Sequence, residues 1–183
     1  MTATEAKPRV LTIGHTTHPI DEFIGLLRHQ GVTQVVDIRT LRGSRHCPWF
    51  DEEVLGPSLE DAGLGYLAEP RLGGLRPRSK TVDAAVNGMW RVASFHKYAD
   101  YALGEEFEAG LGHLLELARA PALPVIMCAE AVWWRCHRRI VADHLIARGV
   151  SVSHVMPDGR LEVATLTPGG VVGAGGEVTY PAG

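Results

Sequence analysis

Apolar residues along the chain fall into two patterns. Short apolar runs typical of buried strands occupy residues 10–13, 32–38, 64–67, 122–127 and 150–156. Between them, apolar residues recur at the three-to-four-residue spacing of amphipathic helices over residues 18–30, 51–62, 90–103, 105–119 and 133–148. Because strands alternate with helices, the pattern predicts an α/β fold, a three-layer sandwich whose mostly parallel central sheet carries helices on both faces.

The distribution of glycine and proline suggests how the chain is organised. We expect a single α/β domain over residues 1–156 and a C-terminal extension over residues 157–183, as an edge hairpin or a flexible tail. Residues 56–78, also rich in glycine and proline, are interpreted as a long functional loop.

Composition narrows the class of protein. Of 183 residues, 45% are hydrophobic and 21% are charged, as in ordinary globular proteins. The net charge of −3 and the pI of about 6.3 do not favour nucleic acid as a partner, although a local basic patch would suffice. Three irregularly spaced cysteines and the lack of a long apolar run lead us to expect a cytoplasmic protein without membrane contact.

Reactive and charged side chains gather where the predicted strands end. His15 follows the first strand, Asp37 and Arg39 end the second, and Cys128 and Glu130 follow the fourth. Ligands of open parallel sheets bind outside the carboxyl ends of the strands. The sequence therefore predicts a site at this edge of the sheet.

Cys128 is the candidate nucleophile of this site. A thiol between a strand and a helix N-terminus, near cations, is pushed towards the thiolate, which is the reactive form. Glu130, His15 and Asp37 complete the candidate catalytic residues, as groups that move or hold a proton. The alternative is a buried structural cysteine, because free cysteine is among the most buried residue types.

Helix geometry separates the residues that follow Cys128. In a helix starting at Trp133, Arg135 and Arg138 share the stripe that faces the sheet, whereas Cys136 lies at its margin. Cys136 is therefore interpreted as a helix residue outside the pocket. A buried arginine needs a partner, for which the candidates are Asp37, Glu130 or a bound anion. A purely structural pair between such an arginine and a carboxylate, with no role in binding, is an equally open alternative.

Two loops add candidates for substrate binding. The loop after the second strand is locally basic, and glycines in the loop near residue 73 would let the backbone approach a phosphate closely. The alternatives are that these loops are merely solvated and that Tyr98 only packs in the core. The candidate substrate-binding residues are Arg39, Ser44, Arg45, Gly73, Gly74, Tyr98, Arg135 and Arg138.

Five ordered segments resemble the domain of unknown function 488 family. They are Thr12-Ile-Gly-His-Thr16, Asp37-Ile-Arg39 with Ser44-Arg45, Leu72-Gly-Gly74, Phe95 to Tyr101, and Cys128-Ala-Glu130 with Cys136-His-Arg138. The resemblance covers roughly residues 9–156 and implies a small prokaryotic cytosolic α/β protein with these polar segments as its site. In this sequence the loop after Arg39 lacks the proline that usually precedes the Ser-Arg pair.

Three functions are compatible with these residues. The first is a thiol-dependent enzyme that acts on a phosphate-bearing or nucleotide-like substrate, with arginines holding the anion and no cofactor. The second is a non-catalytic module that binds a nucleotide or nucleic acid. The third is a metal-dependent enzyme with Cys and His ligands, although seven residues between Cys128 and Cys136 is poor zinc spacing. Substrate, reaction class and oligomeric state stay open.

Overall fold

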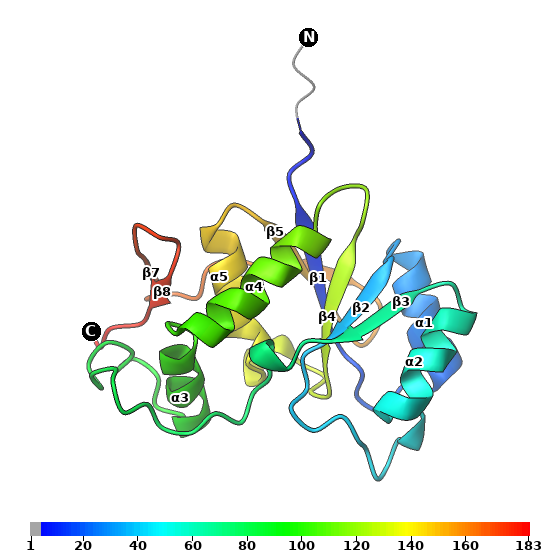
Figure 1. The fold of residues 1–183 in the computed structure, drawn as a ribbon, viewed down its shortest axis with the longest axis horizontal. Coiled ribbons are helices and arrows are strands. Elements are labelled where there is room, and N and C mark those ends of the chain that lie inside the picture. Colours follow the sequence, from blue (N-terminus) through cyan, green and yellow to red (C-terminus); the bar gives the residue numbers. More distant parts are fainter. Residues whose placement is uncertain (1–4) are drawn as a thin grey trace.

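The computed structural model describes residues 5–183 and is built around one mixed sheet (Figure 1). The six strands of this sheet lie in the order β3-β2-β4-β1-β5-β6, and every neighbouring pair is parallel except β5 and β6. The strands are β1 (Arg9–Gly14), β2 (Gln34–Asp37), β3 (Gly65–Ala68), β4 (Pro124–Cys128), β5 (Ser151–Val155) and β6 (Leu161–Val163). The predicted α/β fold is confirmed.

Five α-helices cover the two faces of the sheet. They are α1 (Ile20–His29), α2 (Glu52–Asp61), α3 (Ala93–Tyr101), α4 (Glu105–Leu117) and α5 (Arg138–Ala147). Figure 1 shows α1 and α2 grouped on one side of the molecule and α3, α4 and α5 on the other. Three short 3-10 helices, η1 (Pro48–Phe50), η2 (Pro70–Leu72) and η3 (Trp133–Arg135), lie in the connections.

Alternation along the buried strands produces two separate cores. Val35 and Val125 point into the core shared with α1 and α2, whereas their neighbours Val36 and Ile126 point into the core shared with α3, α4 and α5. Side chains of successive strand residues point to opposite faces, so each strand supplies both cores. This is why the central strands are apolar throughout.

Strand β4 occupies the point of the sheet where the connections change face. Its neighbours β1 and β2 are followed by α1 and α2 on one face, whereas β4 itself is followed by α5 on the other. The segments that leave these strands therefore diverge and open a crevice at their carboxyl ends. Cys128, the last residue of β4, lies at this crevice.

The segment after β4 differs from the predicted continuous helix. Trp133 begins η3, Cys136 is extended with φ −125° and ψ 149°, and α5 starts only at Arg138. The indole of Trp133 stacks on His154 of β5, with centroids 4.6 Å apart and ring planes 7° apart. This tertiary contact holds the segment against β5, and the helix starts five residues later than its apolar spacing indicates.

Residues 157–183 contribute β6 to the main sheet and a separate two-stranded hairpin of β7 (Val171–Val172) and β8 (Val178–Thr179). Residues 161–163 thus pair with β5 at the edge of the main sheet, and the hairpin of the extension forms later in the chain. The Tyr180 hydroxyl donates to Asp143 of α5 at 2.6 Å, and its ring is buried. None of the helices in residues 5–183 is long and apolar enough to cross a bilayer.

Candidate functional site

Cys128 is positioned by a close approach between two backbone segments. Gly14 pairs in register with Cys128, and the backbone N–H of His15 donates to the Cys128 carbonyl at 2.8 Å. A Cβ at Gly14 would overlap the Glu130 carbonyl, so only glycine lets the loop after β4 fold across the end of β1. The Glu130 carbonyl then lies 3.7 Å from the Cys128 Sγ.

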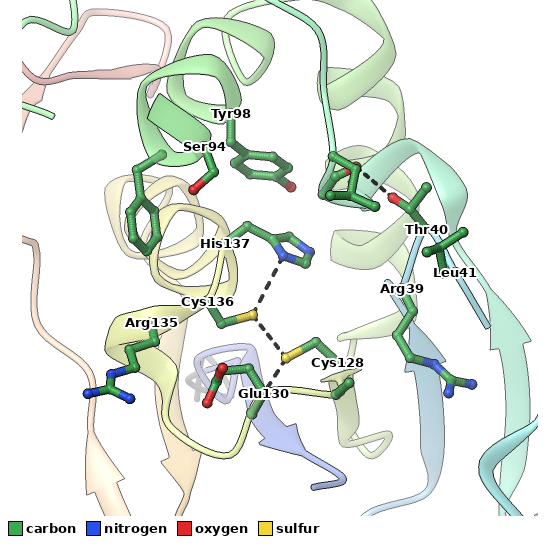
Figure 2. A pocket seen from close by; sticks show the side chains of 14 residues that line it. Arg39, Thr40, Leu41, Ser94, Tyr98, Cys128, Glu130, Arg135, Cys136 and His137 are labelled. Carbon is green, nitrogen blue, oxygen red and sulfur yellow. Dashed lines mark hydrogen bonds between the residues drawn. The ribbon is translucent and has the colours of Figure 1, made fainter. Parts of the chain in front are cut away.

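Cys136 lies beside Cys128, which overturns the interpretation that it is a helix residue outside the pocket. The two Sγ atoms are 2.9 Å apart, although eight positions separate the residues (Figure 2). The extended backbone of Cys136 turns its side chain back towards the end of β4. Both thiols are free and buried, with exposed fractions of 3% for Cys128 and 6% for Cys136.

His137 supplies a base next to the second sulfur. Its Nε2 lies 3.3 Å from the Ile38 carbonyl, which can only accept, so Nε2 carries a proton. Its Nδ1 lies 3.5 Å from the Cys136 Sγ and, in this tautomer, has a free lone pair for the thiol proton. The Cys136 sulfur, the His137 imidazole and the Ile38 carbonyl therefore form the chain of nucleophile, base and orienting group that activates a cysteine.

Arg138 is buried beneath the cysteine pair with an exposed fraction of 1%. Its guanidinium donates to the Glu130 carbonyl at 2.8 Å and to the Thr12 hydroxyl at 3.1 Å, while its Nε has no partner. The Thr12 hydroxyl lies in turn 2.6 Å from the Nδ1 of His154. Among residues 5–183, no carboxylate forms an ion pair with Arg138, in contrast to the predicted pairing with Asp37 or the Glu130 side chain.

The surroundings favour the thiolate on Cys136. Burial raises the pKa of both thiols, but the Cys136 thiolate accepts from the Cys128 thiol, from the backbone N–H of Arg138 at 3.5 Å and, once His137 has taken the thiol proton, from the His137 ring. Despite burial, the hydrogen bond from Cys128 and the charges of His137 and Arg138 hold the pKa of Cys136 well below its ordinary value. Burial and the neighbouring Cys136 raise the pKa of Cys128, which therefore keeps its proton.

A cavity of about 300 Å³ opens above the two sulfurs. Figure 2 shows Tyr98 and Ser94 of α3 on the side opposite Cys128, with Arg39 at one end and Arg135 at the other. Much of the lining is apolar and comes from Leu41, Leu75, Phe95, Tyr98 and Ala129. The volume suits a small molecule or one end of a larger one.

Two exposed charges stand at the rim of this cavity. Arg135 and Glu130 both line it, and Arg135 forms no ion pair within the part of the chain that the structure describes. The prediction that Arg135 faces the sheet is wrong, because the residue lies in η3 and not in the helix that carries Arg138. An exposed guanidinium at a cavity mouth is suited to attract an anionic group.

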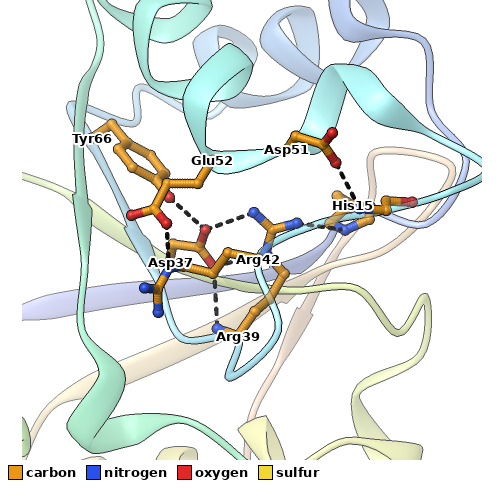
Figure 3. Close-up of polar contacts among 8 residues, drawn as sticks. His15, Asp37, Arg39, Arg42, Asp51, Glu52 and Tyr66 are labelled. Carbon is orange, nitrogen blue, oxygen red and sulfur yellow. Dashed lines mark hydrogen bonds and ion pairs between the residues drawn. The ribbon is translucent and has the colours of Figure 1, made fainter.

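Asp37 points to the opposite face of the sheet and is enclosed by donors (Figure 3). Its Oδ1 accepts from the backbone N–H and the Nε of Arg39, and its Oδ2 accepts from the Arg39 Nη2 at 2.7 Å and the Tyr66 hydroxyl at 2.6 Å. These four hydrogen bonds fill the roughly four acceptor sites of a carboxylate. Asp37 therefore serves to hold Arg39, which also lines the cavity.

His15 belongs to the same polar cluster as Asp37. Its Nδ1 donates to the Thr16 carbonyl at 2.8 Å, and its Nε2 accepts from the Arg39 Nη1 at 3.3 Å. The ring stacks on Phe50 with centroids 4.1 Å apart. Burial lowers the pKa of His15 to about 4, so the imidazole is neutral near pH 7. It does not line the cavity above the cysteines.

The other predicted binding residues divide between the cavity and the surface. Ser44 and Arg45 lie in the loop after β2, where the Ser44 backbone N–H donates to Asp51, and they line a separate shallow depression. A Cβ at Gly73 would meet the Thr40 hydroxyl, and one at Gly74 would meet the His137 ring. These glycines thus let Thr40 and His137 pack closely against the backbone, and Gly74 also lines the cavity.

Tyr98 reaches the cavity from the core. Its hydroxyl donates to the Leu72 carbonyl at 2.7 Å, and its ring lies 4.9 Å from that of His137. The aromatic ring therefore supports the imidazole while its edge faces the cavity.

Cys136 and His137 were not among the residues predicted to act. The adjacent Cys and His residues are a visible signal in the sequence, but the expected helix placed Cys136 at the margin of its sheet-facing stripe, away from the first thiol. Cys47, the third cysteine, packs in the core shared with α1 and α2 and does not line the cavity. Within residues 5–183, no group of three or more His, Cys, Asp or Glu side chains is arranged to hold a metal ion.

The fold and the site define a small α/β protein with a pair of thiols at the carboxyl end of its central strand. The family described as "Domain of unknown function DUF488" matches residues 19–145, which is more than half of the chain. The chain belongs to this family, as its sequence segments indicated. The match excludes β1, β5 and the C-terminal segment. Neither the curated proteins nor the solved structures contain a match to the chain.

Proposed function

We propose that this protein is a thiol-dependent enzyme in which Cys136 is the nucleophile and the substrate is a small organic anion. The observation that carries the proposal is the position of the Cys136 Sγ, which touches the Cys128 thiol at 2.9 Å and the His137 Nδ1 at 3.5 Å. His137 accepts the thiol proton, and the Ile38 carbonyl keeps its ring in the tautomer that can do so.

The buried guanidinium of Arg138 supports the same assignment. An isolated charge in the interior is costly, and buried charges are normally paired. Arg138 has only neutral oxygen partners, on Glu130 and Thr12, so its charge is compensated best when a thiolate stands above it. Arg138 thus stabilises the deprotonated cysteine pair, and the thiolate in turn stabilises the buried arginine.

The cavity supports a substrate with one charged group on an apolar body. Leu41, Leu75 and Phe95 offer apolar contacts, and Arg135 offers an exposed charge. Of the two arginines that line the cavity, Arg39 is already paired with Asp37, so Arg135 is the one available to a substrate. A single carboxylate or phosphate therefore fits better than a polyphosphate.

Alkylation kinetics test the proposal. The native reduced protein is treated with iodoacetamide between pH 5 and 9, and each cysteine peptide is quantified by mass spectrometry. Cys136 is expected to react fastest at pH 7, and its rate falls as the pH falls through its lowered pKa. The Cys47→Ser variant is the matched control and keeps this profile. Equally slow labelling of all three cysteines would refute the proposed nucleophile.

Substrate class is tested separately by thermal shift with small carboxylates and phosphate monoesters. Ligands that bind the native cavity raise the melting temperature, and the rise grows with the logarithm of the ligand concentration above the Kd. The Arg135→Gln variant should lose this stabilisation, while Arg160→Gln, which changes an exposed arginine that does not line the cavity, should retain it. Stabilisation that is equal in both variants would contradict the role given to Arg135.

A further inference from the structure

The two sulfurs of the site are close enough to be joined. Cys128 ends β4 and Cys136 lies in the extended break before α5, so the two residues belong to different elements and meet only through their side chains. Their Sγ atoms are 2.9 Å apart, and a disulfide bond is about 2.05 Å long. Bond formation therefore requires a movement of less than about 1 Å.

We propose that Cys136 and Cys128 form a redox-active dithiol that exchanges two electrons with small organic disulfides, a reaction that rests on the thiolate function proposed above. Cys136 is the attacking sulfur and Cys128 is the resolving sulfur. The substrate class is a low-molecular-weight disulfide whose substituents carry an acidic group, because the cavity combines apolar walls with Arg135.

The exchange proceeds in two displacements. The Cys136 thiolate attacks one sulfur of the substrate disulfide, whose S–S bond breaks and whose other half leaves as a thiolate that takes the proton held by His137. Cys128 then loses its proton to the solvent and attacks the Cys136 Sγ, which breaks the mixed disulfide and releases the second half as a thiolate that takes a proton from the solvent. The protein loses two electrons and two protons, and one disulfide molecule becomes two thiols. A small dithiol reverses the sequence.

The contacts around each sulfur agree with this division of roles. Three donors surround the Cys136 Sγ, whereas the Cys128 Sγ has the Glu130 carbonyl as its other neighbour at 3.7 Å. Thiol–disulfide exchange is fastest when the attacking sulfur is a thiolate. Cys128 is held within reach as a protonated thiol until a mixed disulfide on Cys136 gives it a target.

Arg138 sets the direction of the exchange. In the reduced state the thiolate compensates the buried guanidinium, whereas a disulfide is neutral and leaves Arg138 with only its neutral partners. The environment therefore stabilises the reduced pair, and a pair whose reduced form is stabilised is a strong oxidant. Its disulfide should be reduced readily by small dithiols.

Ellman's reagent, an aromatic disulfide with carboxylate groups, tests the proposal on the reduced native protein. We expect fast release of two thionitrobenzoate molecules from each protein molecule, with no adduct left on the chain. Trypsin cleaves after Arg135, between the two cysteines, so the product should contain residues 120–135 linked to residues 136–138. This readout uses the natural chain and does not depend on a variant that folds.

Two variants separate the roles of the sulfurs. Cys128→Ser should release one thionitrobenzoate quickly and retain the other on Cys136, because the resolving sulfur is missing. Cys47→Ser, which removes the cysteine of the other core, should behave like the natural chain.

Each contrary result has its own meaning. Fast release of one thionitrobenzoate with a stable adduct on Cys136 of the natural chain would overturn the dithiol proposal and leave the thiolate function standing. Release of thionitrobenzoate as slow as the reaction of Cys47 would overturn both the dithiol proposal and the proposed thiolate function. A linked peptide pair that includes Cys47 in place of Cys128 would also overturn the dithiol proposal.

Discussion

Replacing Arg138 with methionine removes the guanidinium that lies beneath the cysteine pair. Methionine is long, flexible and apolar, so it can occupy much of the same buried volume. The change deprives the Glu130 carbonyl and the Thr12 hydroxyl of a donor, at a cost of about 1–3 kcal/mol for each group left unsatisfied. Relief from burying an unpaired charge offsets part of this cost. The variant should therefore fold, with reduced stability.

The main consequence of Arg138→Met concerns the thiol pKa. A charge of opposite sign within about 4–6 Å typically shifts a pKa by about 1–3 units. Without Arg138 the pKa of Cys136 should therefore rise, because one of the positive charges that oppose the effect of burial on the thiolate is removed. Each unit by which this pKa exceeds the working pH lowers the thiolate fraction about tenfold.

The assay is the initial rate of iodoacetamide labelling at Cys136, measured by peptide mass spectrometry across pH 5 to 9. We expect the rate of Arg138→Met at pH 7 to fall about tenfold or more, while its rate at the highest pH approaches that of the natural protein. Arg139→Met is the matched control, since Arg139 donates to Thr167 and lies over the ring of Trp90.

An unchanged pH profile in Arg138→Met would refute the electrostatic reasoning. So would an equal loss of rate in Arg139→Met, because that result would point to a general loosening of α5 and not to a charge beneath the sulfurs. Circular dichroism at the assay temperature shows whether each variant is folded during labelling.

Four further predictions follow from contacts in and around the site. His137→Phe keeps a ring against Tyr98 but removes the base, so labelling of Cys136 at pH 7 should fall about tenfold, whereas His29→Phe on the exposed side of α1 should leave it unchanged. Burial lowers the pKa of His15 to about 4 and those of His144 and His154 to about 3, so these rings are neutral in the native state and take up protons near pH 6.5 when the chain unfolds. Stability should therefore be fully present above pH 6.5 and fall as the pH drops towards 4, by about 3 kcal/mol for His15 alone, and urea unfolding at pH 7.5 and 5 checks this. Gly14→Ala should lower the melting temperature by several degrees and slow the labelling of Cys136, because its Cβ displaces the Glu130 carbonyl, whereas Gly112→Ala has open space. Oxidation of the dithiol should lower the melting temperature because the disulfide leaves Arg138 without an anion, and a rise of the size usual for structural disulfides would contradict this.

The sequence was sufficient for the layers of the fold because the apolar spacing of its elements directly reflects burial. The strand before Cys128 and the helices before and after it follow from that spacing, and Gly31 ends the first helical segment with φ 75° as a glycine can. The family followed from short polar segments at strand ends. These features are local, and local patterns can be read from the chain.

The geometry of the site could not be predicted in the same way. The break at Cys136 depends on the stacking of Trp133 on His154, which is 21 positions away, and no glycine or proline marks it. Asp37 and Arg39 looked available for a ligand, but alternation along β2 turns Asp37 to the other face, where Arg39 and Tyr66 occupy it. Such contacts depend on the packed structure, and residue spacing does not encode them.

The proposed function requires that the native protein hold a thiolate on Cys136. Ultraviolet absorbance of the reduced protein, recorded while the pH is lowered from 9 to 4, detects the loss of thiolate directly. We predict one transition well below the pH of about 8.5 at which a free thiol titrates, present in Cys47→Ser and missing in Cys136→Ser. A transition near pH 8.5 or above in the natural protein, or one that persists in Cys136→Ser, would contradict the claim.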